Sequence, residues 1–330
     1  MKISTLYLLL FIFLFGCTTK GQYIGFQQKE RNFDTVIELQ VLDSMKIEDA
    51  FSLQGWKINA NNISFITYKV TDNFLSVYSY PNCQKLYGYG KIGQGPDEFV
   101  SAFSGDAVSE DALLYDLMSR KLVQLTLGED SLWISKKLPL YNGEDGVCKL
   151  FTFISQIEGD KYLMKIDEYE SSSWEIADLG KNEILDSYKN PIRKAEASYT
   201  PFDFIQCIYD STFIVAYKYM DRIELYSIVN DKIKPMVVLG SDKDQSELES
   251  YNDLLHYYVA VASYEGLFYC LKSRNGENFG NIVEVYDCHG ECRVKYTLGK
   301  IVDSINIDTE GCLVGYVSDV DETIIYRFKQ

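Results

Sequence analysis

Acidic side chains are the most abundant groups that could take part in chemistry in this chain of 330 residues, which holds 48 acidic and 32 basic residues. Two carboxylates on either side of a bound sugar can act as the acid and base of a glycoside hydrolase. The acids that we consider for such a pair are Asp97, Glu98, Asp203, Glu265, Glu284 and Asp319. So many carboxylates bring some pair together by chance, and the chain has neither a Ser-x-Asp-x-Gly-x-Thr-Trp repeat nor a Gly-x-Ser-x-Gly elbow. A carboxylate-dependent glycoside hydrolase is therefore the alternative function, and no residue is assigned as catalytic.

One local cluster of metal-binding or redox side chains stands out, Cys288-His289-Gly290-Glu291-Cys292. A corner of two thiols and an imidazole needs further ligands to complete a tetrahedral zinc site, and no second pair follows it. The order of these residues also differs from the CxxCH motif that attaches haem. We therefore predict a hairpin turn from Asp287 to Cys292 with Gly290 at the bend, a candidate disulfide between Cys288 and Cys292, and neither a metal nor a cofactor.

The N-terminus has the parts of a signal peptide that ends in an acylated cysteine. Lys2 is followed by an unbroken apolar run of ten residues, Leu6–Phe15, which is too short for the roughly 20 residues that span a bilayer. Leu14-Phe15-Gly16-Cys17 resembles the lipobox of bacterial lipoproteins, with a small residue before the cysteine, although Phe15 departs from the usual small or β-branched choice. This resemblance implies a signal peptide over 1–16, a lipid on Cys17 and a tether over 17–32.

The expected location and partners follow from the N-terminus and from the charge. An acidic cluster just after the cysteine would resemble the surface-export signal of Bacteroidetes lipoproteins, and Thr18–Gln22 contains none. We therefore expect a protein of the outer membrane that faces the periplasm. A formal net charge of −16 repels the phosphates of nucleic acid, which excludes that class of partner. The expected partners are the membrane, through the lipid anchor, and a glycan, a peptide or another protein.

From Phe33 onward, short runs of β-branched and aromatic residues alternate with Asp, Asn, Gly and Ser turns, which is typical of strands and hairpins. Helical spacing is confined to Gln245–Tyr258. The expected strands group into six units that begin roughly 40 to 50 residues apart, the period of a propeller blade. These units span 63–89, 102–138, 151–188, 204–239, 257–298 and 302–328. We therefore predict an all-β, six-bladed β-propeller over 33–330.

The last unit is one strand short, whereas the early strand Val36–Val41 has no unit of its own. We predict that this N-terminal strand completes the last blade, because a closed ring leaves only short, protected sheet edges. A pair of β-sandwiches and a β-helix are the competing architectures. A sandwich pair needs a linker near the middle of the chain, and no Pro/Gly/Ser-rich stretch is found there.

A glycine-rich segment, 88–99 with the sequence GYGKIGQGPDEF, is the most distinctive stretch of the chain. A nucleotide-binding loop would end in Gly-Lys-Ser/Thr or lead into a helix, and neither follows here. We predict instead a structural loop between two blades. In this loop Gly93 and Gly95 permit positive φ, Pro96 fixes a turn, and Phe99 anchors the loop in the next blade.

The same segment carries a family resemblance. Lys91–Phe99, which follows the strand Phe74–Tyr78, resembles the TolB-like six-bladed β-propeller lipoproteins of Bacteroides and relatives, and Ile282–Asp287 with Tyr296–Gly299 resembles their blades. The resemblance extends over the whole chain after the leader. It implies a six-bladed ring on a lipid anchor, with no established activity and no catalytic residue to carry over. The sequence therefore indicates a binding or scaffolding module of the cell envelope whose ligand is a glycan, a peptide or a partner protein.

Overall fold

The computed structural model describes residues 25–47, 53–67, 73–107, 112–128, 131–140, 151–167, 172–190, 204–240, 255–318 and 322–329. Within these ranges every regular element is a β-strand, and no helix is long and apolar enough to cross a membrane. The expected all-β class is confirmed for this part of the chain. Most of the helical pattern Gln245–Tyr258 lies outside the described residues, and its final residue, Tyr258, begins a strand.

Three sheets each contain four antiparallel strands that follow one another in the sequence. The first holds β3 (Leu53–Ile58), β4 (Asn62–Thr67), β5 (Leu75–Ser79) and β6 (Lys85–Tyr89). The second holds β7 (Phe103–Gly105), β8 (Ala112–Asp116), β9 (Lys121–Leu127) and β10 (Leu132–Pro139). The third holds β11 (Phe151–Glu158), β12 (Lys161–Asp167), β13 (Ser172–Asp178) and β14 (Glu183–Lys189).

The other two sheets each include a strand from the N-terminus. The fourth has the order β1-β18-β17-β16-β15, with β1 (Gln27–Lys29), β15 (Phe204–Tyr209), β16 (Thr212–Tyr217), β17 (Arg222–Val229) and β18 (Lys232–Gly240). The fifth has eight strands in the order β19-β20-β21-β22-β2-β25-β24-β23. Its strands are β2 (Val36–Ile47), β19 (Tyr258–Tyr264), β20 (Leu267–Ser273), β21 (Gly280–Asp287), β22 (Cys292–Val302), β23 (Ser304–Ile307), β24 (Leu313–Ser318) and β25 (Thr323–Lys329).

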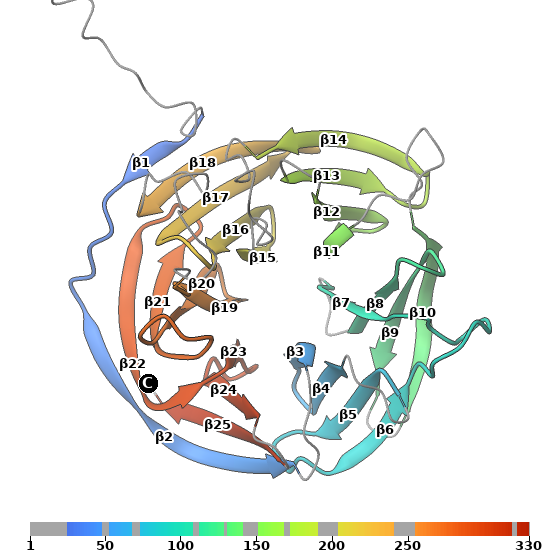
Figure 1. The fold of residues 1–330 in the computed structure, drawn as a ribbon, viewed down its shortest axis with the longest axis horizontal. Helices are drawn as coiled ribbons and strands as arrows, with labels where there is room; N and C mark the ends of the chain where they lie inside the picture. The colour runs from blue at the N-terminus through green and yellow to red at the C-terminus, as the bar shows by residue number, and fades with distance from the viewer. Residues whose placement is uncertain are drawn as a thin grey trace, which may run out of the picture.

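The sheets stand around a central axis in a propeller-like ring (Figure 1). The first strand of each repeating unit lies nearest the axis, so β3, β7, β11, β15, β19 and β23 form the inner circle. Neighbouring sheets pack against one another through both faces, and β4, β8 and β13 are buried along their whole length. This two-sided burial explains why many of the strands are continuous apolar runs and do not alternate strictly between apolar and polar residues.

The strands fall within the expected units with small shifts at the ends, and the unit expected over 204–239 is found as β15 to β18, from Phe204 to Gly240. The sequence pattern misses β3, so the first unit begins at Leu53 and not at Ile63. The fifth and last expected units share the eight-stranded sheet, and the count of six separate blades stays a prediction. A propeller-like arrangement is what the structure shows.

The N-terminal strap, which we define as residues 27–47 with β1 and β2, closes the ring from outside. Strand β1 pairs in parallel with β18, and Val36–Leu39 pairs in parallel with β22. The longer part of β2, Gln40–Ile47, pairs antiparallel with β25. The N-terminal strand thus joins the last unit, as expected, but it extends beyond Val41 and also joins β22. Part of the expected tether over 17–32 is a strand of the fourth sheet.

Buried aspartates shape several of the hairpin turns. Asp287 Oδ1 accepts hydrogen bonds from the backbone N–H groups of His289 and Glu291, and Gly290 at the bend has φ +75. The hairpin expected from Asp287 to Cys292 is present between β21 and β22. Asp308 holds the turn between β23 and β24 in the same way. These side chains satisfy backbone donors that the sheet leaves unpaired, which is why Asp occurs at the ends of these strands.

Candidate functional site

The expected loop over 91–99 joins β6 of the first sheet to β7 of the second. The N–H of Phe99 donates to the carbonyl of Lys91 over 2.9 Å, and the N–H of Gly93 donates to the carbonyl of Phe99 over 3.0 Å. The Phe99 ring is fully buried among apolar residues of both sheets. The carbonyl of Pro96 accepts a hydrogen bond from the Lys121 ammonium. This loop is a packed connection between sheets.

The glycines of this loop have a different role from the expected one. Neither Gly93 nor Gly95 has positive φ; Gly90, at the end of β6, has φ +79. A Cβ at Gly93 or Gly95 would instead collide with or crowd the side chain of Glu98. The Glu98 carboxylate folds over the loop and accepts a hydrogen bond from the N–H of Gly95 over 2.8 Å. Glycine is therefore needed at both positions because a larger side chain would take the space of that carboxylate.

The three cysteines singled out from the sequence lie at the N-terminus and at one hairpin. Cys17 is outside the described residues. Cys288 and Cys292 flank the hairpin between β21 and β22 as free, partly buried thiols. The disulfide between them is not formed in this structure and stays a prediction for the oxidised protein.

The candidate hydrolase acids do not come together in the described part of the chain. Asp97 and Glu98 lie in the loop between β6 and β7, whereas Glu265 and Glu284 belong to the sheet that contains β20 and β21, across the ring (Figure 1). Glu284 is 1% exposed and lies within 3.6 Å of the ammonium groups of Lys272 and Lys295. Asp203 and Asp319 are outside the described residues.

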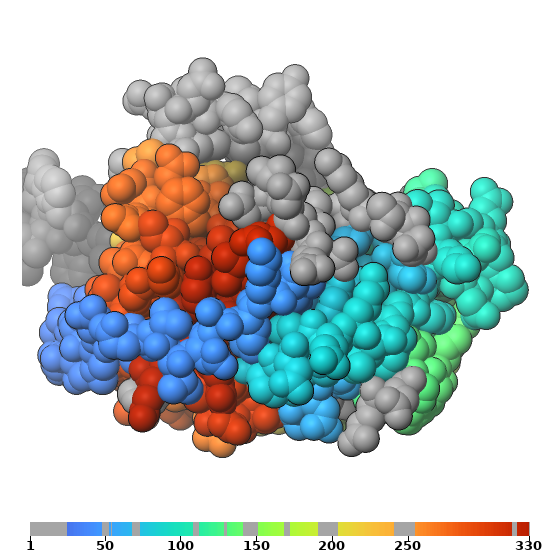
Figure 2. Space-filling model, turned by 90° about the horizontal axis from the view of Figure 1, so that it is seen from below, coloured from blue at the N-terminus to red at the C-terminus, as the bar shows by residue number. Residues whose placement is uncertain are grey.

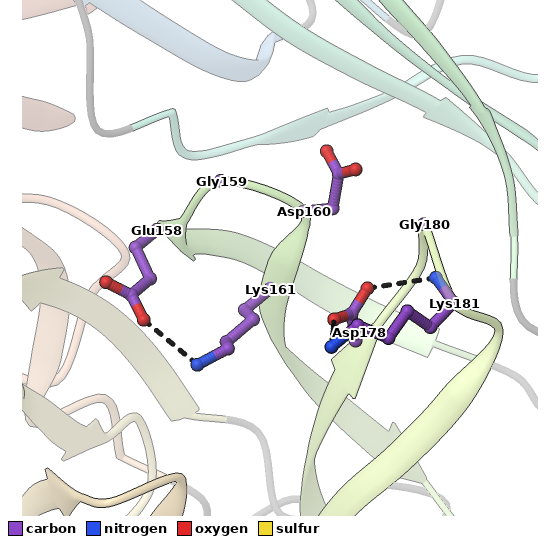
Figure 3. Close-up of a pocket in the computed structure, with 7 residues that line it drawn as sticks. All are labelled: Glu158, Gly159, Asp160, Lys161, Asp178, Gly180 and Lys181. Carbon is purple, nitrogen blue, oxygen red and sulfur yellow. Dashed lines mark hydrogen bonds and ion pairs between the residues drawn. The ribbon is translucent and has the colours of Figure 1, made fainter.

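A hollow of about 530 Å³ lies at the hairpin turns of the third sheet (Figure 3). It is lined by Glu158–Lys161 at the turn after β11 and by Asp178, Gly180 and Lys181 at the turn after β13. Its charges are already paired, since the Lys161 ammonium contacts Glu158 at 3.0 Å and the Lys181 ammonium contacts Asp178 at 2.9 Å. Exposed pairs of this kind are weak and common on protein surfaces. The hollow therefore offers little unsatisfied chemistry to a ligand.

The inner circle of strands offers a more promising arrangement. Five residues with charged, hydroxyl or thiol side chains lie on or directly after five of the six innermost strands. We call them the axial cluster: Lys57, Asp106, Ser155, Cys207 and Ser263. Lys57, on β3, donates from its ammonium to the carbonyl of Ala107 over 3.1 Å. This bond ties the first sheet to the end of β7 and brings a positive charge close to Asp106.

Backbone pairing holds Asp106 in place. Its N–H donates to the carbonyl of Ile154 over 2.9 Å, and its carbonyl accepts from the N–H of Gln156 over 2.8 Å. Burial raises the pKa of the Asp106 carboxyl, and the positive charge of Lys57 opposes that rise. Ser155, which pairs with Asp106 through the backbone, is fully buried, and its hydroxyl has no hydrogen-bond partner.

The other half of the axial cluster comes from β15 and β19. The Ser263 hydroxyl donates to the carbonyl of Ile208 over 3.1 Å, which links these two strands. Burial raises the pKa of the Cys207 thiol well above its usual range, and the charge of Asp106 raises it further. A thiol in this state is a poor nucleophile. The cluster therefore supplies a cation, a carboxyl group and hydroxyls that can bind a polar ligand, and no activated nucleophile.

Metal binding finds no support in the ranges that the structure describes, where no group of three or more His, Cys, Asp or Glu side chains could hold an ion. The sequence reasoning did not find the axial cluster. Lys57 lies on the strand that the pattern missed, and Asp106 directly follows the short strand β7. The sequence feature that could have indicated the cluster is the polar residue that stands on or directly after the first strand of a unit.

Three solved structures resemble this chain in fold. A member of the DUF4221 family from Bacteroides vulgatus ATCC 8482 is 12% identical, with a TM-score of 0.55 over 88% of this chain and 98% of that one. A protein thought to be exported from Bacteroides fragilis NCTC 9343 is 14% identical, with a TM-score of 0.56 over 92% and 99%. A luciferin-regenerating enzyme is 9% identical, with a TM-score of 0.52 over 87% and 95%.

The chain shares its propeller-like fold with these proteins. Identities this low show a common fold and no common activity. No protein-family model matches the chain, and no curated protein is similar to it. The expected kinship with Bacteroides propellers is supported at the level of fold, whereas the narrower TolB-like, six-bladed family remains to be tested.

Proposed function

We propose that this chain is a lipid-anchored β-propeller of a bacterial cell envelope, and that it binds a polar ligand at the axis of its ring. The observation that carries the proposal is the axial cluster, in which Lys57 and Asp106 lie close together on the inner circle of strands. Innermost strands from several sheets meet there, so a ligand can contact many of them at once.

The six-bladed count follows from dividing the eight-stranded sheet in two. Strands β19 to β22 form one antiparallel group, and β23 to β25 with Gln40–Ile47 of β2 form another. Among the described strands, the parallel pairing of Val36–Leu39 with β22 is the only backbone pairing between the two groups. With the other four sheets these groups make six blades, in agreement with the TolB-like resemblance.

The proposed location rests on the N-terminus and on a structural neighbour. The leader over 1–16 ends in a lipobox-like Cys17, and one protein of the same fold is thought to be exported. We place the chain at the outer membrane, facing the periplasm, with its lipid on Cys17. The ligand is a glycan, a peptide or a partner protein, because hydroxyls and an opposite-charge pair suit hydrogen-bonding groups of all three.

Two experiments test this proposal. The chain from residue 17 with Cys17→Ser is screened, with its Lys57→Met variant, against immobilised oligosaccharides and peptides. We expect binding by the parent that the variant loses, and no binding by the parent would contradict a ligand of those two classes. Mass spectrometry of the chain expressed with its leader tests the anchor, since an unmodified Cys17 would refute it.

A further inference from the structure

The outer side of the strap carries an unusual group of exposed aliphatic side chains, which we call the rim patch. It comprises Val36, Ile37 and Leu42 on β2 and Ile301 on β22, with exposures of 63%, 40%, 50% and 40%. The two strands pair through Val36–Leu39, and Val36 and Ile37, as successive strand residues, expose their side chains on opposite faces of this outer strand. Figure 2 shows the strap as a blue band along the outer side of the ring.

The two strands of the rim patch hold no excess of acids although the whole chain has a net charge of −16. Strands β2 and β22 contain two acids, Glu38 and Asp43, and four bases, Lys46, Arg293, Lys295 and Lys300. The Lys46 ammonium pairs with Glu322. This part of the surface can therefore approach a membrane without the repulsion that the acidic chain as a whole would meet.

The residue Gly25, just before the strap, lies close in sequence to the proposed anchor. Gly25 packs against Pro235 on β18, the outer strand of the neighbouring sheet. Cys17 lies only eight residues before Gly25. At about 3.3–3.6 Å per residue, that segment spans at most roughly 26–29 Å. A lipid on Cys17 would therefore hold the strap side of the ring close to the bilayer surface.

We propose that the rim patch rests on the lipid bilayer, with its aliphatic side chains in the interfacial region, so that the ring stands beside the membrane on its strap. The inference rests on the proposed lipid anchor. Val, Leu and Ile offer no ring for sugar stacking and no hydrogen-bonding group, which favours acyl chains over a glycan as the occupant.

Fluorescence quenching by the membrane tests the contact. The full lipidated chain is placed on vesicles of phosphatidylethanolamine and phosphatidylglycerol whose acyl chains carry bromine, which quenches nearby tryptophan. The variants Val36→Trp and Leu42→Trp are compared with Met118→Trp, at a 72% exposed position between β8 and β9 on the other side of the ring. After subtraction of the parent signal, we expect at least twofold stronger quenching for both rim tryptophans than for the control.

The possible outcomes separate this inference from the proposed function. Equal quenching at all three positions on vesicle-bound protein overturns the bilayer contact and leaves the anchor intact. Equal quenching at the three positions together with a dimer in analytical ultracentrifugation would mean that a second copy of the chain covers the rim patch. This result also overturns the bilayer contact. A chain that carries no lipid and does not float with vesicles overturns both proposals.

Discussion

The guanidinium of Arg31 reaches Asp221 across 190 residues of sequence, with Nη1 2.5 Å from Oδ1. Its Nε also lies 3.9 Å from Oε2 of Glu284 on β21. Burial disfavours the charge of this guanidinium, but the carboxylates and the two tyrosine hydroxyls around it raise the pKa of Arg31 above its ordinary value. Arg31 therefore stays charged and connects the strap to two neighbouring sheets.

A comparison of β17 and β21 explains why the strap supplies this arginine. Glu224 and Glu284 are both buried in the third strand of a unit, and each accepts a hydrogen bond from the tyrosine two residues later. Arg222 pairs with Glu224 from the same strand, at 2.6 Å. The equivalent position in β21 is Ile282, and the cations around Glu284 come from other elements: Lys295 at 3.3 Å, Lys272 at 3.6 Å and Arg31 of the strap at 3.9 Å. The strap thus adds a charge to this group as well as a strand to a sheet.

Replacing Arg31 by Met should lower the free energy of unfolding by about 1.5–3 kcal/mol, because it removes a charged hydrogen bond to the partly buried Asp221 and one of the cations near the buried Glu284. Lys272 and Lys295 remain near Glu284 and limit the loss. Urea unfolding measures the change. Lys29→Met is the matched control on the same strap, since its pair with the exposed Glu291 should contribute less than about 1 kcal/mol. Equal losses in the two variants would contradict this role of Arg31.

The first and last units are joined by a side-chain hydrogen bond from the Tyr80 hydroxyl to Oδ2 of Asp308, over 3.0 Å. Burial, followed by the charge of Asp308, raises the pKa of Tyr80, so the hydroxyl remains a donor at neutral pH. Tyr80→Phe should cost about 1–2 kcal/mol of stability, as expected for a hydrogen bond to a charged group. Thermal unfolding checks this, with Tyr264→Phe as the control at an exposed hydroxyl. An unchanged melting temperature for Tyr80→Phe would show that the bond does not help to close the ring.

The Asp106 carboxyl should leave a signature in the pH dependence of stability. Because burial raises its pKa in the folded state, the folded chain holds this proton more tightly than the unfolded chain. The resulting stability is present below the unfolded pKa of about 3.9 and is lost as pH rises through the folded pKa. Asp106→Asn should therefore gain stability relative to the parent between pH 3.5 and pH 7. Urea unfolding across this range measures the difference, with Asp97→Asn as an exposed control; a difference that does not change with pH would contradict it.

The loop between β6 and β7 should not tolerate a methyl group at Gly93. Gly93→Ala would displace the Glu98 carboxylate from the N–H of Gly95 and cost about 1–3 kcal/mol. Gly299→Ala is the control, because its Cβ would meet neighbours at ordinary contact distance. Denaturant unfolding of both variants decides the point, and a Gly93→Ala chain as stable as the parent would show that the carboxylate can move freely.

Strand positions could be predicted from this sequence because β-branched and aromatic runs end at clear turn residues. The strap could be predicted only in part. The polar Gln27–Lys29 has no strand pattern, and its pairing with β18 depends on how the ring brings the two together. The strand β3 was missed because Gly55 and Lys57 interrupt its apolar pattern.

The axial cluster could not be predicted from local spacing. Lys57 and Ser263 are more than 200 positions apart in sequence, and only the ring places their strands in one circle. The lipobox and the glycine-rich loop, by contrast, are contiguous stretches that can be recognised directly. The lipobox-like stretch and the loop can therefore be predicted from contiguous residues, whereas the axial cluster, whose members come from separate units, cannot.

The central claim is that the axial cluster binds the ligand, and its most direct test is a calorimetric titration. The tightest oligosaccharide or peptide from the screen is titrated into the Cys17→Ser chain and its Lys57→Met, Asp106→Asn and Lys85→Met variants. The last removes an exposed lysine of β6 and serves as the control. We expect at least tenfold weaker binding for Lys57→Met and Asp106→Asn, with the control unchanged and all variants folded. Equal affinity in all four proteins would contradict the claim.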